Sequence, residues 1–364
     1  MRVSATAAAL HLPFVGAFSH AAAERSRSSS IVVRLQTDDG TVGFGEGCPR
    51  EYVTGETLEG TLRAFEALRP AVEGGLPNRI EDVTDWLDER TGAGAPSLRC
   101  ALECAALDVL GKRTGRSVAE LLGVRAERVR YSAVIANSAP NAARRVAERC
   151  AAVGFADVKV KVDADLGANL ARVRAVREAL GDDVTVRVDA NMAWATYGEA
   201  ARQTEQLLDL GVWCVEQPMA RDALQDTSRL DSAFPGCILL DEAIVSDTDL
   251  ERVLDTGFGG RVLLKVSKNG GPLGTLRMKR RLDAAGVPAH LGTHVGETSL
   301  LSAAGRVVAG VSPFSTVEGS AGRHLLAEDL VAQPLEFGLG GWAPTRYGEG
   351  SGWQLAVRDP PNAL

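Results

Sequence analysis

Short apolar runs alternate with amphipathic helical stretches along most of the chain. From about Val129 to Glu318, each run rich in Val, Ile and Leu is followed by a segment whose apolar residues recur at helical spacing. This alternation predicts parallel strands joined by crossover helices. The candidate strands span 131–135, 157–162, 184–189, 213–216, 237–241, 261–266, 288–292 and 313–317. Eight such units predict an α/β protein with a (β/α)7-8 barrel of the TIM type.

The flanking regions show other patterns. Ser30–Thr37 alternates like a strand, Asp38-Asp-Gly is a hairpin turn signal, and apolar residues at helical spacing follow from Thr57 to Leu122. We therefore expect an α+β capping domain over residues 1–125 and the barrel over 126–320. Residues 321–364 are Gly-rich and irregular at first, and we expect this segment to return to the capping domain.

Composition narrows the class of protein. The 364 residues carry a formal net charge of −7 without blocks of like charge, which argues against nucleic acid or an anionic membrane as partner. Six cysteines without a CxxC pair do not form a disulfide scaffold. His11 and Pro13 interrupt the first apolar stretch, so an opening strand is favoured over a signal peptide. We expect a cytoplasmic protein with a small-molecule partner.

Charged residues stand where the buried strands end. Buried parallel strands should be apolar throughout, and in a barrel their carboxyl ends meet on one face, where such enzymes keep their chemistry. The spacing between successive charges is 28, 27, 25 and 24 residues, close to one repeat each. The set in chain order is Lys161, Asp189, Glu216, Asp241 and Lys265, with Glu297 after the seventh strand.

This set suggests a metal site flanked by two lysines. Asp189, Glu216 and Asp241 are three carboxylates on successive strands, an all-oxygen set that favours Mg2+, with Mn2+ also suitable. Lys161 and Lys265 lie on strands either side of these three. A lysine beside a divalent cation can act as a base near neutral pH, and the metal can hold the enolate formed when a carbon acid loses its proton.

The ordered motifs resemble the enolase superfamily, in its mandelate racemase/muconate-lactonizing-enzyme branch. They are Lys159-Val-Lys161, Val188-Asp-Ala-Asn191, Val215-Glu-Gln-Pro218, Leu240-Asp-Glu-Ala243 and Leu264-Lys-Val-Ser-Lys-Asn-Gly-Gly271. The resemblance implies that Lys161 and Lys265 are the catalytic proton-transfer pair and that Lys159 lowers the pKa of its neighbour. It implies supporting positions behind the metal for Asn191 and Glu242. Lys268 matches a less central lysine and could equally pair with a carboxylate at the rim.

The resemblance also implies that the capping domain closes two mobile loops over the barrel mouth. Here these loops would be Pro13–His20 and Cys48–Glu56. Further substrate-binding candidates follow the seventh and eighth strands. His294 stands where related enzymes usually carry an aliphatic or sulfur residue. Only Glu318 could replace the Asp-x-Asp pair that holds an ammonium group in dipeptide epimerases. The substrate-binding candidates are Phe18, His20, Arg50, Tyr52, His294, Glu297 and Glu318.

Three functions remain open. The first is a metal-dependent isomerase that removes the proton next to a carboxylate through an enediolate, as a racemase or epimerase of an N-acylamino acid or dipeptide-like carboxylate. The second is a cycloisomerase or a dehydratase/lyase, for which one lysine suffices. The third is a non-catalytic binding protein of the same fold, because fold does not imply function. The resemblance further implies a homo-oligomer, a dimer or an octamer.

Overall fold

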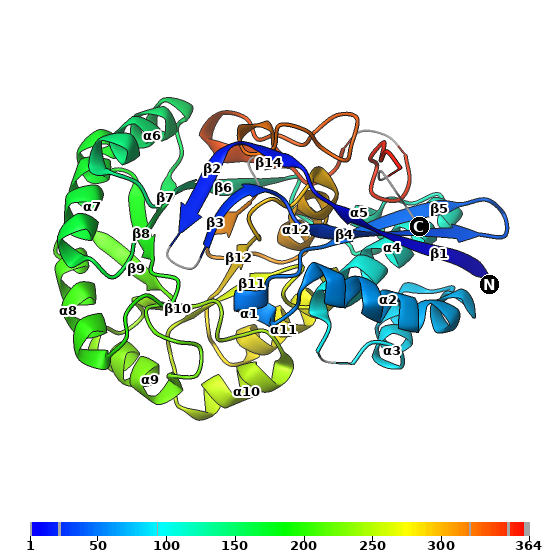
Figure 1. Ribbon diagram of the computed structural model, residues 1–364, viewed down its shortest axis with the longest axis horizontal. Coiled ribbons are helices and arrows are strands. Elements are labelled where there is room, and N and C mark those ends of the chain that lie inside the picture. The colour runs from blue at the N-terminus through cyan, green and yellow to red at the C-terminus, as the bar shows by residue number, and fades with distance from the viewer. Residues whose placement is uncertain (1, 21–22, 93, 320–321, 348–349, 360–364) are drawn as a thin grey trace.

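Eight parallel strands form a closed barrel in the computed structural model (Figure 1). The structure describes residues 2–20, 23–92, 94–319, 322–347 and 350–359; the side chains of residues 17–20, 23, 24 and 323 are also outside the described part. Each strand pairs with the next along the chain, and β13 closes the ring on β6. The strands are β6 (Arg128–Ile135), β7 (Asp157–Lys161), β8 (Thr185–Asp189), β9 (Val212–Glu216), β10 (Ile238–Leu240), β11 (Arg261–Lys265), β12 (Ala289–Gly292) and β13 (Val317–Glu318).

The barrel confirms the fold predicted from the alternating pattern. Seven of the strands fall within about three residues of the predicted ranges, but the eighth is only Val317–Glu318 rather than 313–317. Pro313 precedes it, and proline cannot donate to a strand ladder, which is consistent with the late start. This last strand therefore contributes a very short edge to the ring.

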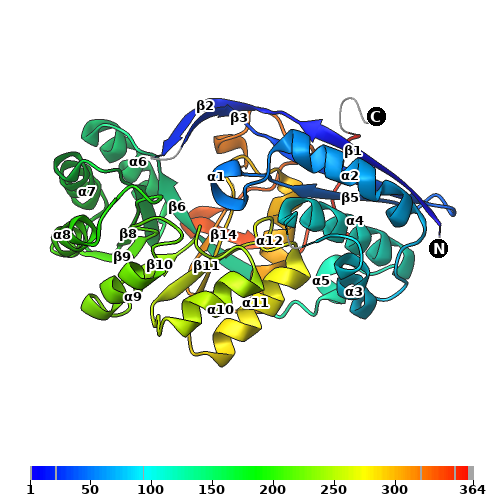
Figure 2. The ribbon, with the colours of Figure 1, turned by 60° about the horizontal axis from the view of Figure 1, so that its bottom comes forward.

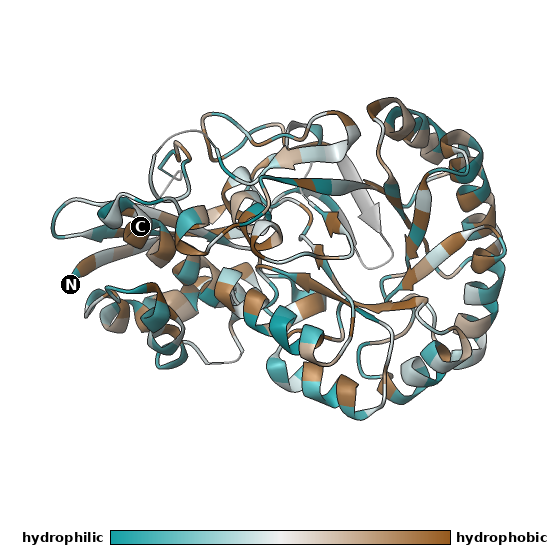
Figure 3. Cartoon of the chain, turned by 180° about the vertical axis from the view of Figure 1, so that it is seen from behind, coloured by the Kyte–Doolittle hydropathy of each residue, from teal (hydrophilic) through white to brown (hydrophobic). Residues whose placement is uncertain are grey.

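Helices surround the strands. They are α6 (Pro140–Val153), α7 (Leu166–Leu180), α8 (Tyr197–Leu208), α9 (Leu224–Ala233), α10 (Asp247–Asp255), α11 (Pro272–Ala284) and α12 (Ser299–Val311). In Figure 3 the outer helices alternate between hydrophobic and hydrophilic positions, as helices with one solvent face do. Helix α12 differs, because every residue from Ser299 to Gly310 is buried. It lies against the N-terminal region, where Thr298 at its N-cap donates to Glu46.

The N-terminal region is an α+β module. An antiparallel sheet of β1 (Val3–Leu10), β4 (Ser30–Thr37) and β5 (Val42–Gly47) packs on α2 (Leu58–Glu73) and α4 (Pro96–Thr114). The shorter helices are η1 (Ile80–Asp82), α3 (Val83–Asp88) and α5 (Val118–Leu121). Three glycines on one face of β5 allow α4 to approach closely: a Cβ on Gly43, Gly45 or Gly47 would lie 2.5, 2.0 or 2.0 Å from a carbonyl oxygen of α4.

The two segments expected as loops contain regular structure. Pro13–His20 forms strand β2, which pairs with β3 (Ala23–Arg27) in a hairpin. Figures 1 and 2 show this hairpin reaching from the N-terminal sheet over the barrel towards α6. The segment 48–56 contains a short helix, α1 (Glu51–Thr54). The loop prediction was wrong in form for both segments, because a pairing strand follows the first directly and a helical turn forms in the second.

The C-terminal segment contacts both parts of the molecule. Its strand β14 (Trp342–Pro344) pairs antiparallel with the first half of β6, and the short helices η2 (Gly322–His324) and η3 (Leu339–Gly341) precede it. Farther on, the backbone N–H of Trp353 donates to Asp108 of α4 at 2.9 Å, and its indole donates to the carbonyl of Cys104. Among the described residues, no helix combines the length and apolar character needed to span a membrane.

Candidate active site

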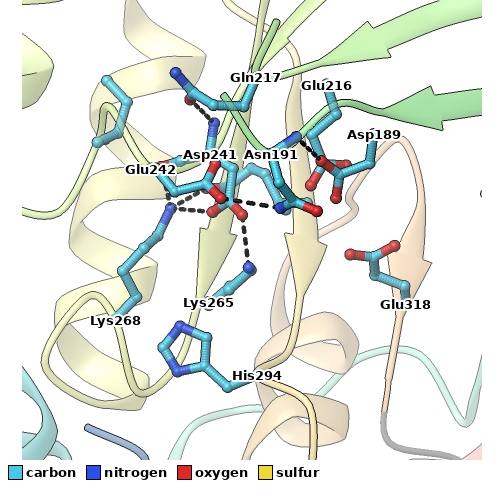
Figure 4. Close-up of polar contacts among 12 residues, drawn as sticks. Asp189, Asn191, Glu216, Gln217, Asp241, Glu242, Lys265, Lys268, His294 and Glu318 are labelled. Atoms are coloured by element: carbon cyan, nitrogen blue, oxygen red, sulfur yellow. Dashed lines mark hydrogen bonds and ion pairs between the residues drawn. The ribbon is translucent and has the colours of Figure 1, made fainter. Parts of the chain in front are cut away.

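Strand register places the first half of the predicted site in one row. Lys161 on β7 is paired with Asp189 on β8, and Asp189 is paired with Glu216 on β9. Asp241 directly follows β10. All three carboxylates are buried, and Figure 4 shows Asp189 and Glu216 with their oxygens turned towards each other. The predicted convergence of strand ends therefore brings these side chains together.

The contact between Asp189 and Glu216 has an electrostatic cost. Burial opposes the charge of Asp189, but Lys161 and Lys159 outweigh it and hold its pKa well below the usual range. Burial and the neighbouring Asp189 raise the pKa of Glu216 well above its usual value. Two carboxylates this close cannot both be charged without a compensating cation. Positive charge beside the pair reduces this cost.

Two lysines of β7 contact these acids. Lys161 Nζ donates to Asp189 at 2.5 Å and to the side-chain oxygen of Asn191 at 2.9 Å. Lys159 Nζ donates to both oxygens of Glu216 at 3.1 Å and lies 3.3 Å from Asp189. Burial disfavours the charge of Lys159, but Glu216 and other carboxylates raise its pKa well above the ordinary value.

Asp241 contacts two lysines at the end of the sixth strand: Lys265 is the last residue of β11, and Lys268 follows it. Lys265 Nζ donates to one carboxylate oxygen at 2.6 Å, and Lys268 Nζ donates to the other at 2.8 Å (Figure 4). Lys268 also donates to the backbone carbonyls of Asp241 and Leu263 and is fully buried. Burial opposes the charge of Lys265, but Asp241 raises its pKa well above the ordinary value. Lys265 borders the cavity described below, whereas Lys268 lies behind it.

Asn191 and Glu242 link the two halves. The Asn191 amide donates to Glu242 Oε1 at 3.0 Å, and its backbone N–H donates to Asp189. Asn191 has φ of 43°, in the left-handed region that Asn tolerates better than most residues. Burial and then Asp241 raise the pKa of Glu242 to about 7. Its Oε2 is buried without a hydrogen-bond partner among the described residues.

A second ionic network lies deeper in the barrel. Arg187, two residues before Asp189 on β8, donates to Glu318 Oε2 at 2.8 Å and lies 3.6 Å from Asp157. Lys159 donates to Glu318 Oε1 at 2.6 Å. Both oxygens of Glu318 are thus engaged, and its side chain is buried. Sequence reasoning missed Arg187, although a charged residue within a buried strand was a usable signal.

A cavity of about 760 Å³ opens over these residues. This volume is within the range of small-molecule sites. The residues of the predicted site that border it are Lys159, Lys161, Asn191, Glu242, Lys265, His294, Glu318 and Tyr52. Both lysines proposed for proton transfer thus face the same space, which can hold a small carboxylate.

Comparison with known proteins identifies the family. Residues 141–358 match the family model "Enolase C-terminal domain-like", and residues 2–123 match "Mandelate racemase / muconate lactonizing enzyme, N-terminal domain". The chain belongs to the mandelate racemase/muconate lactonizing enzyme family. It is therefore a member of the enolase superfamily.

Members of this family with known activities are similar over most of the chain. A hydrophobic dipeptide epimerase of Enterococcus faecalis is 32% identical over 75% of this chain and 77% of its own length. N-succinyl-L-Arg/Lys racemase of Bacillus cereus is 29% identical over 83% and 82%, respectively. Muconate cycloisomerase 1 of Pseudomonas putida is 31% identical over 84% and 83%. These relatives are a racemase, an epimerase and a cycloisomerase.

Solved structures of this family share the fold. The N-succinyl Arg/Lys racemase of B. cereus superposes with a TM-score of 0.91 at 27% identity, covering 99% of this chain and 96% of that one. The dipeptide epimerase of E. faecalis, complexed with Mg and the dipeptide L-Leu-L-Tyr, has a TM-score of 0.89 at 27% identity, covering 98% and 100%.

The other substrate-binding candidates lie around the site in different settings. Tyr52 and His294 border the cavity. The His294 Nδ1 lies 3.1 Å from the Cys48 carbonyl, and burial and Lys265 lower its pKa well below the usual value. Glu297 is buried, accepts from the His294 backbone N–H, and has a pKa raised to about 8 by burial.

Arg50 contacts the protein backbone rather than the cavity. Its guanidinium is fully buried and donates to the carbonyls of Ser29, Pro49 and Val295, so it ties the N-terminal module to the loop after β12. Neither Arg50 nor Glu297 is among the described residues that border the cavity. The side chains of Phe18 and His20 lie outside the described residues.

Proposed function

We propose that the protein is a racemase or epimerase that removes and returns the proton next to a carboxylate. The observation that supports this most directly is the placement of two cavity-facing lysines on either side of three buried acids. Lys161 contacts Asp189 at one end of the acidic row, and Lys265 contacts Asp241 at the other. Two such groups can serve opposite faces of one carbon atom. The similarity to a racemase and to epimerases agrees with this proposal.

We further propose Asp189, Glu216 and Asp241 as ligands of Mg2+, with Mn2+ as a possible substitute. No group of three acidic, His or Cys side chains that could hold an ion is found among the described residues as they stand. Lys161 and Lys265 instead form ion pairs with Asp189 and Asp241. The donor set nevertheless fits: all oxygen, buried, and with two carboxylates in mutual contact. A related epimerase structure contains Mg. When bound, the metal supplies positive charge that stabilises negative charge developing on the substrate carboxylate.

The lysines have defined tasks in this proposal. The carboxylates at present raise the pKa of Lys265, so its amine holds its proton. Neutralisation of Asp241 would remove this attraction, and a buried amine then loses its proton more readily. One lysine takes the proton from one face of the α-carbon, and the other delivers a proton to the opposite face. Lys268 stays behind Asp241 and orients its carboxylate.

The surroundings of Glu318 favour N-acylated substrates over substrates with a free ammonium group. Glu318 borders the cavity, but Lys159 and Arg187 already occupy its two oxygens. Releasing it to bind an ammonium group would leave both of those buried cations without this partner, which costs several kcal/mol. We therefore propose an N-acylamino acid, or a peptide-like carboxylate whose amine is acylated, as substrate.

The test is exchange of the α-proton with solvent. The protein with Mg2+ in deuterium oxide should incorporate deuterium at the α-carbon of N-acetyl- or N-succinyl-amino acids and interconvert their enantiomers. Lys161→Ala and Lys265→Ala should each reduce interconversion by about 10²–10⁴-fold, the range for a lost general acid or base. Each variant should keep some exchange with only one enantiomer, through the remaining lysine.

Lys279→Ala is the matched control, because Lys279 of α11 pairs with the exposed carboxylate of Asp283 and does not border the cavity. It should lower interconversion little. Undiminished interconversion in either site variant would refute the assignment of the lysine pair.

A cycloisomerase is the second candidate function, favoured by the 31% identity to muconate cycloisomerase 1. It would need only one of the two lysines for proton transfer, and the other could remain a cation. Product analysis distinguishes the two functions. A new ring, or an alkene from the related elimination, without any epimer would support this candidate.

A further inference from the structure

Short strand pairings close the barrel beside β6. The edge of β6 opposite β7 is covered in two pieces: β14 pairs with Arg128–Arg130, and β13 pairs with Tyr131 and Ser132. The next residues of the strand, 133–135, have described strand partners only on β7. Along this part of β6, no strand of the described residues pairs with the edge opposite β7.

The cavity borders this part of β6. Ser132, Ala133 and Val134 all border it. Successive residues of a strand point to opposite faces, so the cavity touches both the inner and the outer side of β6. Two of these side chains are small, which leaves room for a chain of atoms to pass. The space over the catalytic lysines is thus continuous with space outside the ring of strands.

The outer part of the cavity, here called the apolar arm, lies between α6 and the C-terminal segment. It is lined by Val146, Cys150, Val153, Phe155, Phe337 and Leu339. The three residues from α6 are spaced i, i+4 and i+7, so they share one helical face. Phe337 packs edge-on against Phe155 at 5.5 Å, which gives the arm an aromatic wall. Leu339 is 80% exposed and marks the outer end.

The chemistry of the arm selects for apolar groups. Its six lining side chains carry no charge, and burial raises the pKa of the Cys150 thiol to about 11, so that thiol is neutral near pH 7. Two charged or titratable side chains that border the same cavity, Arg149 and His324, are exposed. A polar group inside the arm would lose its water without gaining a partner from these side chains.

We propose that the apolar arm binds an apolar substituent of the substrate's α-carbon, either its side chain or its N-acyl chain. This inference rests on the proposed racemase or epimerase function. The reacting carbon lies between the two lysines, and one substituent passes β6 at Ala133 into the arm. The arm thus determines which N-acylamino acids are used, and long apolar substituents are preferred over short or charged ones.

Binding of two series of ligands tests the proposal and separates the two kinds of substituent. The first is a set of N-acylglycines with acyl chains of two to eight carbons; the second is a set of N-acetyl-amino acids with straight apolar side chains of one to six carbons. Each ligand is titrated by calorimetry into the full chain in the presence of Mg2+. In one of the two series, the Kd of the ligand should fall by up to about fourfold for each added methylene. Dependence in the first series assigns the acyl chain, and dependence in the second assigns the side chain. Flat affinities in both series would overturn the proposal.

Substitutions locate the effect. Ala133→Phe at the passage and Val146→Phe in the arm should reduce the ratio of affinity for the longest ligand to that for the shortest by tenfold or more. Ala151→Phe adds the same bulk to an exposed residue of α6 that does not border the cavity, and should leave this ratio unchanged. Equal losses for long and short ligands in both arm variants would overturn the proposal. Thermal unfolding of each variant identifies a protein that has simply failed to fold.

The outcomes keep the two proposals apart. If α-proton exchange occurs but neither affinity nor rate depends on chain length, the arm proposal fails and the proposed function stands. If affinity rises with chain length but no substrate exchanges its α-proton, the proposed function fails, and the arm is then a binding site for apolar carboxylates without this chemistry.

Discussion

Glu318→Gln is expected to destabilise the protein substantially while preserving the shape of the side chain. The buried carboxylate accepts from Lys159 at 2.6 Å and from Arg187 at 2.8 Å. The amide has one oxygen for two cations, and its NH2 group turns donors towards one of them. Removing one partner from a buried ionic network costs about 3–5 kcal/mol.

The corresponding shift in melting temperature follows from the size of the chain. At about 2.1 cal/mol/K per residue, 364 residues give an unfolding entropy of about 0.76 kcal/mol/K, so a loss of about 3–5 kcal/mol lowers Tm by about 4–7 °C. Differential scanning calorimetry at pH 7 measures this shift. Glu205→Gln, at an exposed position of α8, is the control and should change Tm little.

The pH dependence provides a second check. Burial opposes the charge of Glu318, but Lys159 and Arg187 outweigh it and lower its pKa below the ordinary value. A carboxyl whose pKa is lower in the folded state stabilises the fold above its unfolded pKa, about 4.5, and loses that contribution as pH falls through the folded pKa. The difference between wild type and Glu318→Gln should therefore be largest near pH 7 and shrink below about pH 4.5. A shift in Tm below 1 °C, or one that grows on acidification, would refute the ionic account of this residue.

Three further predictions concern the fold and the metal. Gly45→Ala should destabilise the protein by about 1–3 kcal/mol or more, because its Cβ would lie 2.0 Å from the Ala101 carbonyl oxygen. Gly94→Ala, with open space around it, is the control and should cost little. Urea unfolding measures both, and equal costs would contradict the close packing of β5 on α4. Burial raises the pKa of Glu103 to about 8, so its contribution to stability is present below about pH 4.5 and is lost as pH rises towards 8. Glu103→Gln should therefore flatten the decline of Tm between pH 5 and 8, and an unchanged decline would count against this burial effect. Dialysis against a chelator should abolish α-proton exchange, and Mg2+ should restore it; full activity in protein shown to be metal-free would exclude the proposed metal site.

The strand ends show what could be predicted from sequence. Parallel strands in a barrel share one direction, so a charge repeated once per strand–helix unit must converge on one face. This simple geometry was enough to place Lys161, Asp189 and Glu216 side by side, as the strand register confirms. The fold could also be predicted, because eight alternating strand and helix patterns are typical of a (β/α) barrel.

The contacts between distant segments were beyond such patterns. Glu318 meets Lys159 and Arg187 across 159 and 131 residues, and no periodicity links these positions. For the same reason, Arg50 could be interpreted as a substrate contact, although its guanidinium binds backbone carbonyls from three separate places in the chain. Sequence patterns predict at which face of the barrel a strand ends. They do not predict which distant residue a long Lys or Arg side chain contacts.

The composite edge of β6 has a consequence for how the protein is made. Both segments that cover this edge, β13 and β14, lie near the C-terminal end of the chain, whereas β6 begins at Arg128. During synthesis, more than 180 residues must follow β6 before Val317 can pair with it. Until then β6 is an open edge with unpaired backbone groups, the kind of surface at which chains associate wrongly. We expect truncations before residue 317 to aggregate rather than yield a smaller stable barrel.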